Sequence, residues 1–275
     1  MPRLRKYEKL YIYTLHGAAT GARARFGDSL LAEWEDAGTT LLFFEAPREE
    51  DVRRLADELP GLEYLSETVL DYENWEAGQP VAATRVAGFL VCPTWDILEP
   101  SEDEPRILLD PGVAFGTGLH PTTRSCLRAL REVFTLDRPA RVLDLGCGTG
   151  ILSIAALLLG AESAVAVDYT SMATDTARAC FDLNGLSARS RIILGGAAEN
   201  LHHEAGLIIS NIYIQVIEKL FRRHEYTERK WLLVSGIHGS EQAGIAAGLI
   251  KNSGRKIIET YEENNWYTYL TGLNP

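Results

Sequence analysis

The feature that most constrains the fold is a glycine-rich turn that directly follows a short apolar run in the middle of the chain. Residues 142–150 have the sequence VLDLGCGTG, a pattern typical of a buried strand that enters a tight turn and opens a helix. Glycine allows positive φ angles and lets a ligand approach the backbone without meeting a Cβ atom. In open parallel sheets, ligands bind outside the carboxyl ends of the strands. We therefore expect this turn to line a ligand site.

The spacing of the glycines separates two classes of ligand. Dinucleotide sites use G-x-G-x-x-G before a helix whose N-terminus faces pyrophosphate. Here Gly146, Gly148 and Gly150 follow Asp144 as D-x-G-x-G-x-G. A carboxylate beside the turn repels pyrophosphate but can pair with an ammonium group. S-adenosylmethionine carries an ammonium, a sulfonium and no phosphate, so the pattern favours this methyl donor; the alternative is a tight turn that binds no ligand.

Polar residues also end two other predicted strands. Asp168 ends the next strand, about 20 residues beyond the glycines, where a ribose diol would lie. Asn211 ends a later strand, at the edge where the donor methyl should sit, and its amide oxygen can hold an incoming amine. The alternative for Asn211 is a residue that merely caps the next helix.

A loop rich in glycine and hydroxyl residues precedes the turn, with the sequence LDPGVAFGTGLHPTT over residues 109–123. Gly116 and Gly118 leave backbone amides open, and Thr122 is expected to cap the helix that follows. We expect His120 to orient the loop rather than to act as a base. The alternative is an ordinary loop followed by a capped helix.

These segments together resemble the PrmA family, the methyltransferases of large-subunit ribosomal protein eleven. Residues 109–123 are similar to the family pattern L-D-P-G-x-A-F-G-T-G-x-H-P-T-T, and residues 144–156 to D-x-G-C-G-[ST]-G-I-L-x-I-A-A. Shorter similarities are C-P-T-W at 92–95, S-G-I at 235–237 and Trp266. The resemblance covers residues 60–275 well and the first 60 in pattern only.

The resemblance implies an α/β fold, in which a small α+β, ferredoxin-like domain precedes a Rossmann-like seven-stranded methyltransferase domain. It implies a cytoplasmic, S-adenosylmethionine-dependent enzyme that releases S-adenosylhomocysteine and methylates lysine side chains or an α-amine of the ribosomal protein. Thr117 and Asn211 are the expected catalytic residues. The expected donor contacts are Thr117, Gly118, His120, Asp144, Gly146, Cys147, Gly148, Gly150, Asp168 and Asn211.

Departures from the family pattern fall on acceptor recognition more than on donor binding. After its second strand the family has D-x-D-P, where residues 168–171 are DYTS, and its N-I-L-A corresponds to NIYI at 211–214, which places Tyr213 in the acceptor channel. The first domain is also expected to lack one hairpin strand between Phe44 and Glu49. Three functions remain: the ribosomal-protein methyltransferase, a methyltransferase for another protein or a small molecule, and a non-catalytic relative that binds the donor.

Hydrophobic periodicity divides the chain into a small domain over 1–70, a linker with an N-terminal extension over 71–105 and the donor-binding domain over 106–275. In the small domain we predict strands over 9–15, 39–44 and 62–70 and helices over 22–37 and 49–59. Short strands are predicted over 89–92 and 106–109. Beyond them we predict strands over 141–145, 163–167, 191–194, 207–210, 231–235, 256–260 and 266–270, and helices over 149–159, 171–183, 215–224 and 241–252.

Composition argues against several other classes. With 27 Lys and Arg against 38 Asp and Glu, the formal net charge is −11, which argues against direct nucleic-acid binding. The longest apolar run, 151–161, is too short to cross a bilayer, and the basic N-terminus leads into no apolar export signal. Four widely spaced cysteines suit buried thiols in the cytoplasm. His202 and His203 have no evident third ligand, so we expect no metal site.

Overall fold

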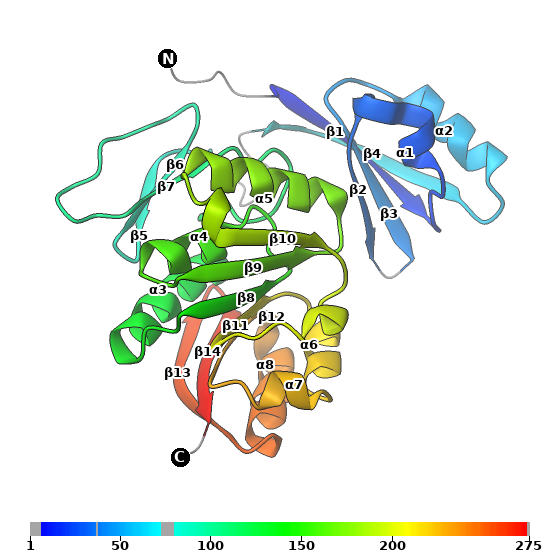
Figure 1. Ribbon diagram of the computed structural model, residues 1–275. Helices are drawn as coiled ribbons and strands as arrows, with labels where there is room; N and C mark the ends of the chain where they lie inside the picture. The colour runs from blue at the N-terminus through cyan, green and yellow to red at the C-terminus, as the bar shows by residue number, and fades with distance from the viewer. Residues whose placement is uncertain (1–6, 37, 73–79, 274–275) are drawn as a thin grey trace. The chain divides into compact units, whose positions relative to one another are not determined.

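A computed structural model describes residues 7–36, 38–72 and 80–273 of the chain (Figure 1). The chain divides into two compact units, one up to Val81 and one from Ala82 onward. Each unit has its own sheet and its own hydrophobic core. Residues 73–79, which belong to the predicted linker over 71–105, lie outside the described part.

The first unit is a four-stranded antiparallel sheet with two helices packed on one face. In chain order its elements are β1 (Lys9–His16), α1 (Ala22–Phe26), β2 (Leu30–Asp36), β3 (Thr39–Phe44), α2 (Glu49–Glu58) and β4 (Glu63–Asp71). The central strand β1 pairs with β3 and β4, and β2 adds to the far side of β3. This βαββαβ arrangement, with strand order β2-β3-β1-β4, is ferredoxin-like, as the resemblance implies.

The prediction of a helix over 22–37 is wrong. Helix α1 ends at Phe26 because Gly27 adopts a φ of 52°, a left-handed value that interrupts an α-helix. The chain continues as strand β2, where the ring centroid of Trp34 lies 5.1 Å from that of Phe43 on β3. The apolar residues of this segment satisfy a helical period, but pairing with β3 decides the local structure. The sheet is therefore not one strand short, because the strand assumed to be absent lies inside the predicted helix.

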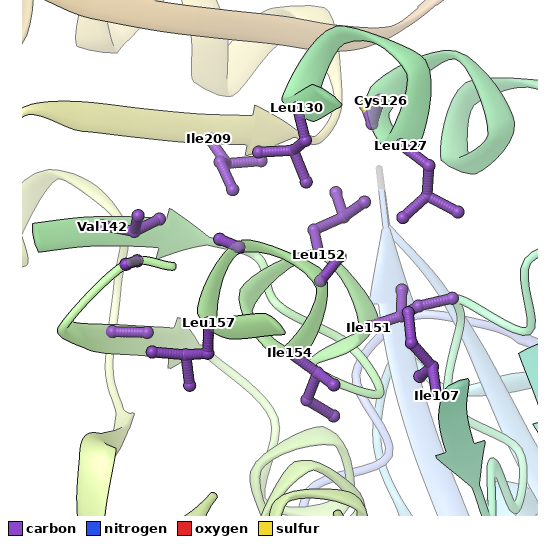
Figure 2. Packing of buried hydrophobic residues seen from close by; sticks show 14 of the residues in the cluster. Ile107, Cys126, Leu127, Leu130, Val142, Ile151, Leu152, Ile154, Leu157 and Ile209 are labelled. Atoms are coloured by element: carbon purple, nitrogen blue, oxygen red, sulfur yellow. The ribbon is translucent and has the colours of Figure 1, made fainter. Parts of the chain in front are cut away.

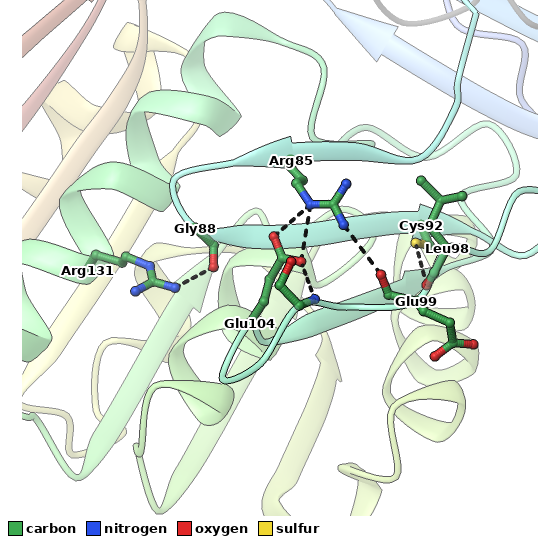
Figure 3. A network of polar contacts seen from close by, with 8 residues as sticks. Arg85, Gly88, Cys92, Leu98, Glu99, Glu104 and Arg131 are labelled. Carbon is green, nitrogen blue, oxygen red and sulfur yellow. Dashed lines mark hydrogen bonds and ion pairs between the residues drawn. The ribbon is translucent and has the colours of Figure 1, made fainter.

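A three-stranded sheet precedes the large sheet of the second unit, and it consists of β5 (Thr84–Val86), β6 (Phe89–Pro93) and β7 (Arg106–Leu109). Arg85 fixes the acidic turn between β6 and β7, because it forms an ion pair with Glu104 and donates to the carbonyl of Glu99 (Figure 3). Arg131 of the helix that follows the three-stranded sheet donates to the carbonyl of Gly88, in the turn between β5 and β6 (Figure 3). The strands predicted over 89–92 and 106–109 are confirmed.

The second unit is built on a seven-stranded sheet in the order β10-β9-β8-β11-β12-β14-β13. From β10 to β12 the neighbouring strands are parallel, and β14 and β13 extend the sheet antiparallel. Successive strands run outward from β8 in one direction and from β11 in the other, so the order reverses between these two. The strands are β8 (Arg141–Leu145), β9 (Ser163–Asp168), β10 (Ser190–Leu194), β11 (Leu207–Asn211), β12 (Trp231–His238), β13 (Arg255–Glu263) and β14 (Trp266–Leu273).

Helices cover both faces of this sheet, so its central strands are apolar on both sides. Along β8, Val142 packs in the core formed with α3, α4 and α5, whereas Leu143 packs in the core formed with α6, α7 and α8. The first core also joins Leu130 of α3 to Ile209 of β11 (Figure 2). The helices are α3 (Pro121–Leu136), α4 (Ile151–Leu158), α5 (Ser171–Leu183), α6 (Ile214–Leu220), α7 (His224–Thr227) and α8 (Gly239–Asn252).

The other elements predicted for the second unit are present, with one correction. The helix predicted over 215–224 is interrupted, because α6 ends at Leu220 and α7 begins at His224. Asn264 and Asn265, with φ of 53° and 63°, form the hairpin turn between β13 and β14. The four cysteines are buried free thiols, as predicted. Within the described ranges, none of the helices has the length and apolar character needed to cross a bilayer.

Candidate functional site

The predicted site residues gather at the carboxyl edge of the large sheet, where its strand order reverses. Strand β8 ends at Leu145 and runs into the glycine turn, while Asp168 and Asn211 are the last residues of β9 and β11. Both strands are parallel neighbours of β8, so the three carboxyl ends lie side by side. The topology therefore brings together segments that are far apart in the sequence.

The glycine turn is the point where three other segments converge. Gly146, Gly148 and Gly150 have φ angles of 77°, 54° and 79°, in the left-handed region that favours glycine. A Cβ atom on Gly146 would lie 2.2 Å from the side chain of Ile212, and one on Gly148 would lie 2.3 Å from the carbonyl oxygen of Phe115. At Gly150 the neighbour, 2.9 Å away, is an aromatic ring of α5. Each glycine thus allows a different segment to pack closely against the turn.

The backbone N–H groups of this turn are bonded within the protein. Those of Gly146 and Cys147 both donate to the carbonyl of Val167, at 2.8 and 3.0 Å. The N–H of Gly148 donates to Oδ2 of Asp168 at 3.1 Å, and the next two N–H groups donate to backbone carbonyls. A pyrophosphate site needs free N–H groups at this point. The turn is therefore not arranged to hold a phosphate.

Two carboxylates lie beside the turn in different environments. Asp168 is 8% exposed, and besides the bond from Gly148 it accepts hydrogen bonds from the N–H and the hydroxyl of Thr170, each at 3.0 Å. Asp144 is 1% exposed, and its Oδ2 accepts a hydrogen bond from Ser153 of α4 at 2.7 Å. Burial, and to a smaller extent the charge of Asp168, raises the pKa of Asp144 to about 7. Of the two, Asp168 is the carboxylate nearer to solvent.

Thr149 fastens the glycine turn to the preceding loop. Its N–H donates to the carbonyl of Phe115 at 3.0 Å, and its hydroxyl donates to the carbonyl of Gly116 at 2.7 Å. Because Thr149 is fully buried, water does not compete for these bonds. The next two loop residues are confined as well: Thr117 is 4% exposed, and a Cβ atom on Gly118 would lie 3.3 Å from Val91 of β6.

His120 ends this loop and caps helix α3. Its Nδ1 accepts a hydrogen bond from the N–H of Thr122 at 3.3 Å, and Pro121 occupies the first helical position. The prediction that Thr122 caps the helix is therefore wrong, because Thr122 already lies in the first turn. Burial, and then the positive charge of Arg124, lowers the pKa of His120 to about 4, so the imidazole is neutral at physiological pH.

The C-terminal hairpin reaches the same edge. Trp266 begins β14 opposite His238, the last residue of β12. The ring of Trp266 lies between two imidazoles, with centroids 4.7 Å from His120 and 4.6 Å from His238. Glu263, at the end of β13, forms an ion pair with Arg124 of α3. The hairpin is therefore connected to both the loop and the helix that border the glycine turn.

Exposed phenol rings lie beside two of the predicted site residues. Asn211 is half-buried, and Tyr213, two residues further on, is 57% exposed. Tyr169, which follows Asp168, is 62% exposed. Tyr213 is a departure from the family pattern, and Tyr169 occupies the variable position of D-x-D-P, so the edge of this chain carries aromatic surface that the resemblance alone does not imply.

The sequence pattern assigns no role to Thr123, but the structure shows that its hydroxyl has unusual surroundings. This residue lies in the first turn of α3 and is 1% exposed, and its Oγ1 has no hydrogen-bond partner among the described residues. A buried hydroxyl without a partner costs about 1–3 kcal/mol. Thr123 is therefore a candidate for contact with a bound molecule. The signal in the sequence is a second threonine, immediately after Thr122, on the buried side of a helix.

The structure brings every predicted donor contact to this edge, but it does not turn every side chain outward. Cys147 is 6% exposed, and burial raises the pKa of its thiol, so it contributes backbone rather than a reactive sulfur. Asp144 is buried against α4. The contacts of these residues with a donor remain predictions.

The large sheet is parallel over five strands and is extended by an antiparallel hairpin, and a glycine turn flanked by carboxylates lies where the strand order reverses. These features define a Rossmann-like methyltransferase fold. The family model described as ribosomal protein L11 methyltransferase (PrmA) matches residues 57–272. The chain belongs to this family.

Individual relatives agree with this assignment. The chain is 36% identical over 209 residues to the ribosomal protein L11 methyltransferase of an Exiguobacterium strain, which covers 73% of this chain and 65% of the relative. It is 30% identical over 216 residues to that of Aquifex aeolicus, covering 78% and 81%. A crystal structure of ribosomal protein L11 methylase from Lactobacillus delbrueckii subsp. bulgaricus superposes with a TM-score of 0.62 at 25% identity, covering 68% of this chain and 96% of that one.

The match does not extend over the full length of every relative. With the Desulfitobacterium hafniense relative, the identity is 37% over 196 residues and the match spans 61% of that protein. The chain thus spans less than two thirds of the Exiguobacterium and Desulfitobacterium relatives.

Proposed function

We propose that the chain is an S-adenosylmethionine-dependent methyltransferase that methylates amino groups of ribosomal protein L11, on lysine side chains or an α-amine. Membership in the PrmA family supports the reaction. The observation that carries the choice of donor is a glycine turn whose N–H groups are already bonded within the protein, beside the carboxylate of Asp168. Such a turn suits a cationic nucleoside without phosphates. The proposed substrate places the protein in the cytoplasm.

Two residues of the carboxyl edge fit this donor on their hydrogen bonding. A carboxylate has about four acceptor positions, and Asp168 uses three, which leaves one for a ribose hydroxyl. Thr123 offers a buried hydroxyl without a partner in the described residues. Thr117 and Asn211 border the same edge and would complete the contacts. When bound, the donor supplies an electrophilic methyl group on a sulfonium.

The acceptor amine must lose a proton before it attacks. A lysine with a pKa near 10.4 is neutral about one time in a thousand at pH 7.4, so deprotonation costs about 4 kcal/mol. Partial burial at the edge and the positive charge of the donor both lower the pKa of the acceptor. The chain then needs no strong base, and alignment of the amine with the methyl group accounts for much of the rate.

The polar groups of the edge suit this division of roles. His120 is a poor proton acceptor for an amine, because its pKa is about 4 and its Nδ1 is bonded to the N–H of Thr122. Asn211, half-buried at the end of β11, can accept a hydrogen bond from the neutral amine through its amide oxygen. We assign Asn211 the task of holding the nitrogen lone pair toward the methyl group, with Thr117 in the facing loop.

Incubation of the purified chain with labelled S-adenosylmethionine and the proteins of the large ribosomal subunit tests this proposal. We expect label in ribosomal protein L11, on amines that mass spectrometry can locate. Asn211→Ala should lower the transfer rate by about a hundredfold because it removes the group that aligns the amine. Asn252→Ala is the matched control, because Asn252 is an exposed residue at the end of α8.

The outcomes distinguish the three candidate functions. Label in another protein or in a small molecule would change the acceptor but keep the reaction. Donor binding by calorimetry without transfer to any acceptor would favour a non-catalytic relative, in which Tyr213 obstructs the approach to Asn211. A chain that binds no donor would overturn the proposal.

A further inference from the structure

A second polar region lies entirely within the first unit, whereas the residues assigned to donor and acceptor all belong to the second unit. A hollow of about 340 Å³ opens between α1, the turn that follows it and the beginning of α2. Its lining residues are Arg25, Phe26, Ser29, Arg48, Asp51 and Arg54. Three of these six residues carry a positive charge, in a chain whose formal net charge is −11.

The positive charge in this hollow is only partly balanced. Asp51 is the one carboxylate among the lining residues, and two guanidinium groups share it. The Arg48 Nη1 lies 3.4 Å from Asp51, and the Arg54 Nη1 lies 3.8 Å from it, both long for a charge-assisted hydrogen bond. Arg25 is bonded to Glu58, which lies outside the lining. Counting Glu58, three positive groups face two carboxylates.

Arg48 carries an unused donor in this region. Its Nε is buried and has no hydrogen-bond partner among the described residues. Its position does not depend on an external partner, because its backbone N–H donates to the hydroxyl of the fully buried Tyr13 at 2.6 Å. Tyr13 in turn donates to Glu67 at 2.8 Å. The guanidinium therefore extends from a fixed backbone and keeps a donor unsatisfied.

We propose that this hollow binds a phosphate group, of the kind found in inorganic phosphate or in a terminal phosphate ester. A single arginine fork matches the two oxygens of a planar carboxylate, whereas three guanidinium groups, one from α1 and two from the beginning of α2, match the three acceptor oxygens of a phosphate. A phosphate monoester carries a charge of about −1.5 to −2 near pH 7, which exceeds the excess positive charge of the hollow. The site is distinct from the carboxyl edge, so this proposal goes beyond the methyl-transfer function.

Binding of inorganic phosphate to the full chain tests the proposal, measured by calorimetry and by phosphorus NMR line broadening at constant ionic strength. We expect saturable binding, weakened about tenfold or more by Arg48→Gln combined with Arg54→Gln, because charge-assisted hydrogen bonds are lost. Arg53→Gln is the matched control: Arg53 lies on the same helix, but it pairs with Glu49 at 2.7 Å and stacks over Tyr64. This control should bind phosphate as the unchanged chain does.

Further arms identify the source of the phosphate and guard against misfolding. A 5′-phosphorylated oligonucleotide should compete with inorganic phosphate, whereas the same oligonucleotide without its terminal phosphate should not. Equal competition by both would show a nucleic-acid backbone site, and equal competition by a glutamate peptide would show a carboxylate site; either overturns the assignment. Unchanged circular dichroism and an unchanged urea-unfolding curve confirm that the first unit of a variant is folded, and Arg54→Gln alone serves if the double variant does not fold. No saturable binding, or equal loss in Arg53→Gln, overturns the proposal.

Discussion

The glycine turn of the second unit and the arginine-lined hollow of the first unit differ in how far their hydrogen-bond donors are satisfied within the protein. In the turn, N–H groups that stand where a dinucleotide fold would bind phosphate donate to Val167, Asp168 and backbone carbonyls instead. In the hollow, two guanidinium groups share Asp51 at long distances, and the Nε of Arg48 has no partner in the described residues. The position of a glycine turn in a Rossmann-like fold therefore does not determine the charge of its ligand. That charge depends on which hydrogen-bond donors and acceptors remain unsatisfied at the site.

This contrast predicts two independent ligands of opposite charge in one chain. The carboxyl edge of the large sheet offers the carboxylate of Asp168 and the hydroxyl of Thr123, which suit a cationic nucleoside. The hollow offers guanidinium groups, which suit an anion. Each side of the comparison can be altered by a single substitution.

The largest effect should follow Gly148→Ala. A Cβ atom there would lie 2.3 Å from the carbonyl oxygen of Phe115, and the φ of 54° is itself unfavourable for alanine. We expect a loss of about 2–4 kcal/mol in the free energy of unfolding, measured in urea, and no measurable donor binding. Gly248→Ala is the matched control, because nothing lies within 4 Å of its Cβ position in α8. Equal stability of the two variants would contradict the close packing of the turn.

The second effect concerns pH. The pKa of Asp144 is raised from its ordinary value of 3.8 to about 7, chiefly by burial. The folded chain therefore binds a proton that the unfolded chain releases between about pH 4 and pH 7, so this group favours folding at the acid end and the contribution is lost as the pH rises. Asp144→Asn should remove this dependence, which amounts to at most roughly 4 kcal/mol at 1.36 kcal/mol per pH unit. Urea unfolding of both chains at pH 4.5 and pH 7.5, chosen as roughly the ends of this window, measures it.

A parallel pH profile for the two chains would mean that Asp144 keeps an ordinary pKa. Glu262→Gln is a suitable control for the charge change, because Glu262 is exposed on β13 and Asp144 is buried.

A third effect is expected from Asp168→Ala, which removes the carboxylate assigned to the ribose. Calorimetry should show an affinity for S-adenosylhomocysteine at least about tenfold weaker, because charge-assisted hydrogen bonds are lost. Binding of phosphate to the hollow should not change, because Asp168 belongs to the other unit. An unchanged donor affinity would refute the assignment of Asp168 to the ribose. A change in phosphate binding would refute the independence of the two sites.

The smallest effect on donor binding should come from Tyr213→Ala. Tyr213 is 57% exposed and lies beyond Asn211, so its ring is placed to meet an acceptor rather than the donor. We expect donor affinity to change by less than about threefold, while KM for the acceptor changes by more, because an aromatic face attracts cationic groups. Tyr169→Ala, which alters the other exposed ring, provides the comparison. A large change in donor affinity for Tyr213→Ala would place this residue in the donor site.

The second unit was open to prediction because its signals are local. Helix α5 occupies the predicted range 171–183, and Thr170 caps it through a side-chain hydrogen bond to the N–H of Ala173. Asn264 and Asn265 adopt the positive φ angles that a two-residue hairpin turn requires, and asparagine favours such angles. The first unit was harder, because β2 is an edge strand whose conformation is decided by pairing with β3 and not by its own residues. A helical period in a short segment cannot reveal that partner.

The site shows the same division. The glycine turn, Asp168 and Asn211 follow from strand ends and spacing, which a sequence displays directly. Three features of the site depend on segments that meet only in the folded chain: the two bonds from Thr149 to the loop, the Thr123 hydroxyl that has no partner in the described part of the chain, and the cap made by His120. The arginine-lined hollow belongs to this second kind, because its side chains come from two separate stretches of sequence, 25–29 and 48–54.

The antiparallel end of the large sheet has a consequence for synthesis on the ribosome. Strand β14 pairs with β12 on one side and β13 on the other, and its first residue, Trp266, contacts the histidine that caps α3. A nascent chain that has emerged only as far as β13 contains the glycine turn but lacks β14 and the contact of Trp266 with this histidine. Donor-binding competence should therefore arise abruptly, when the stretch 266–273 leaves the exit tunnel.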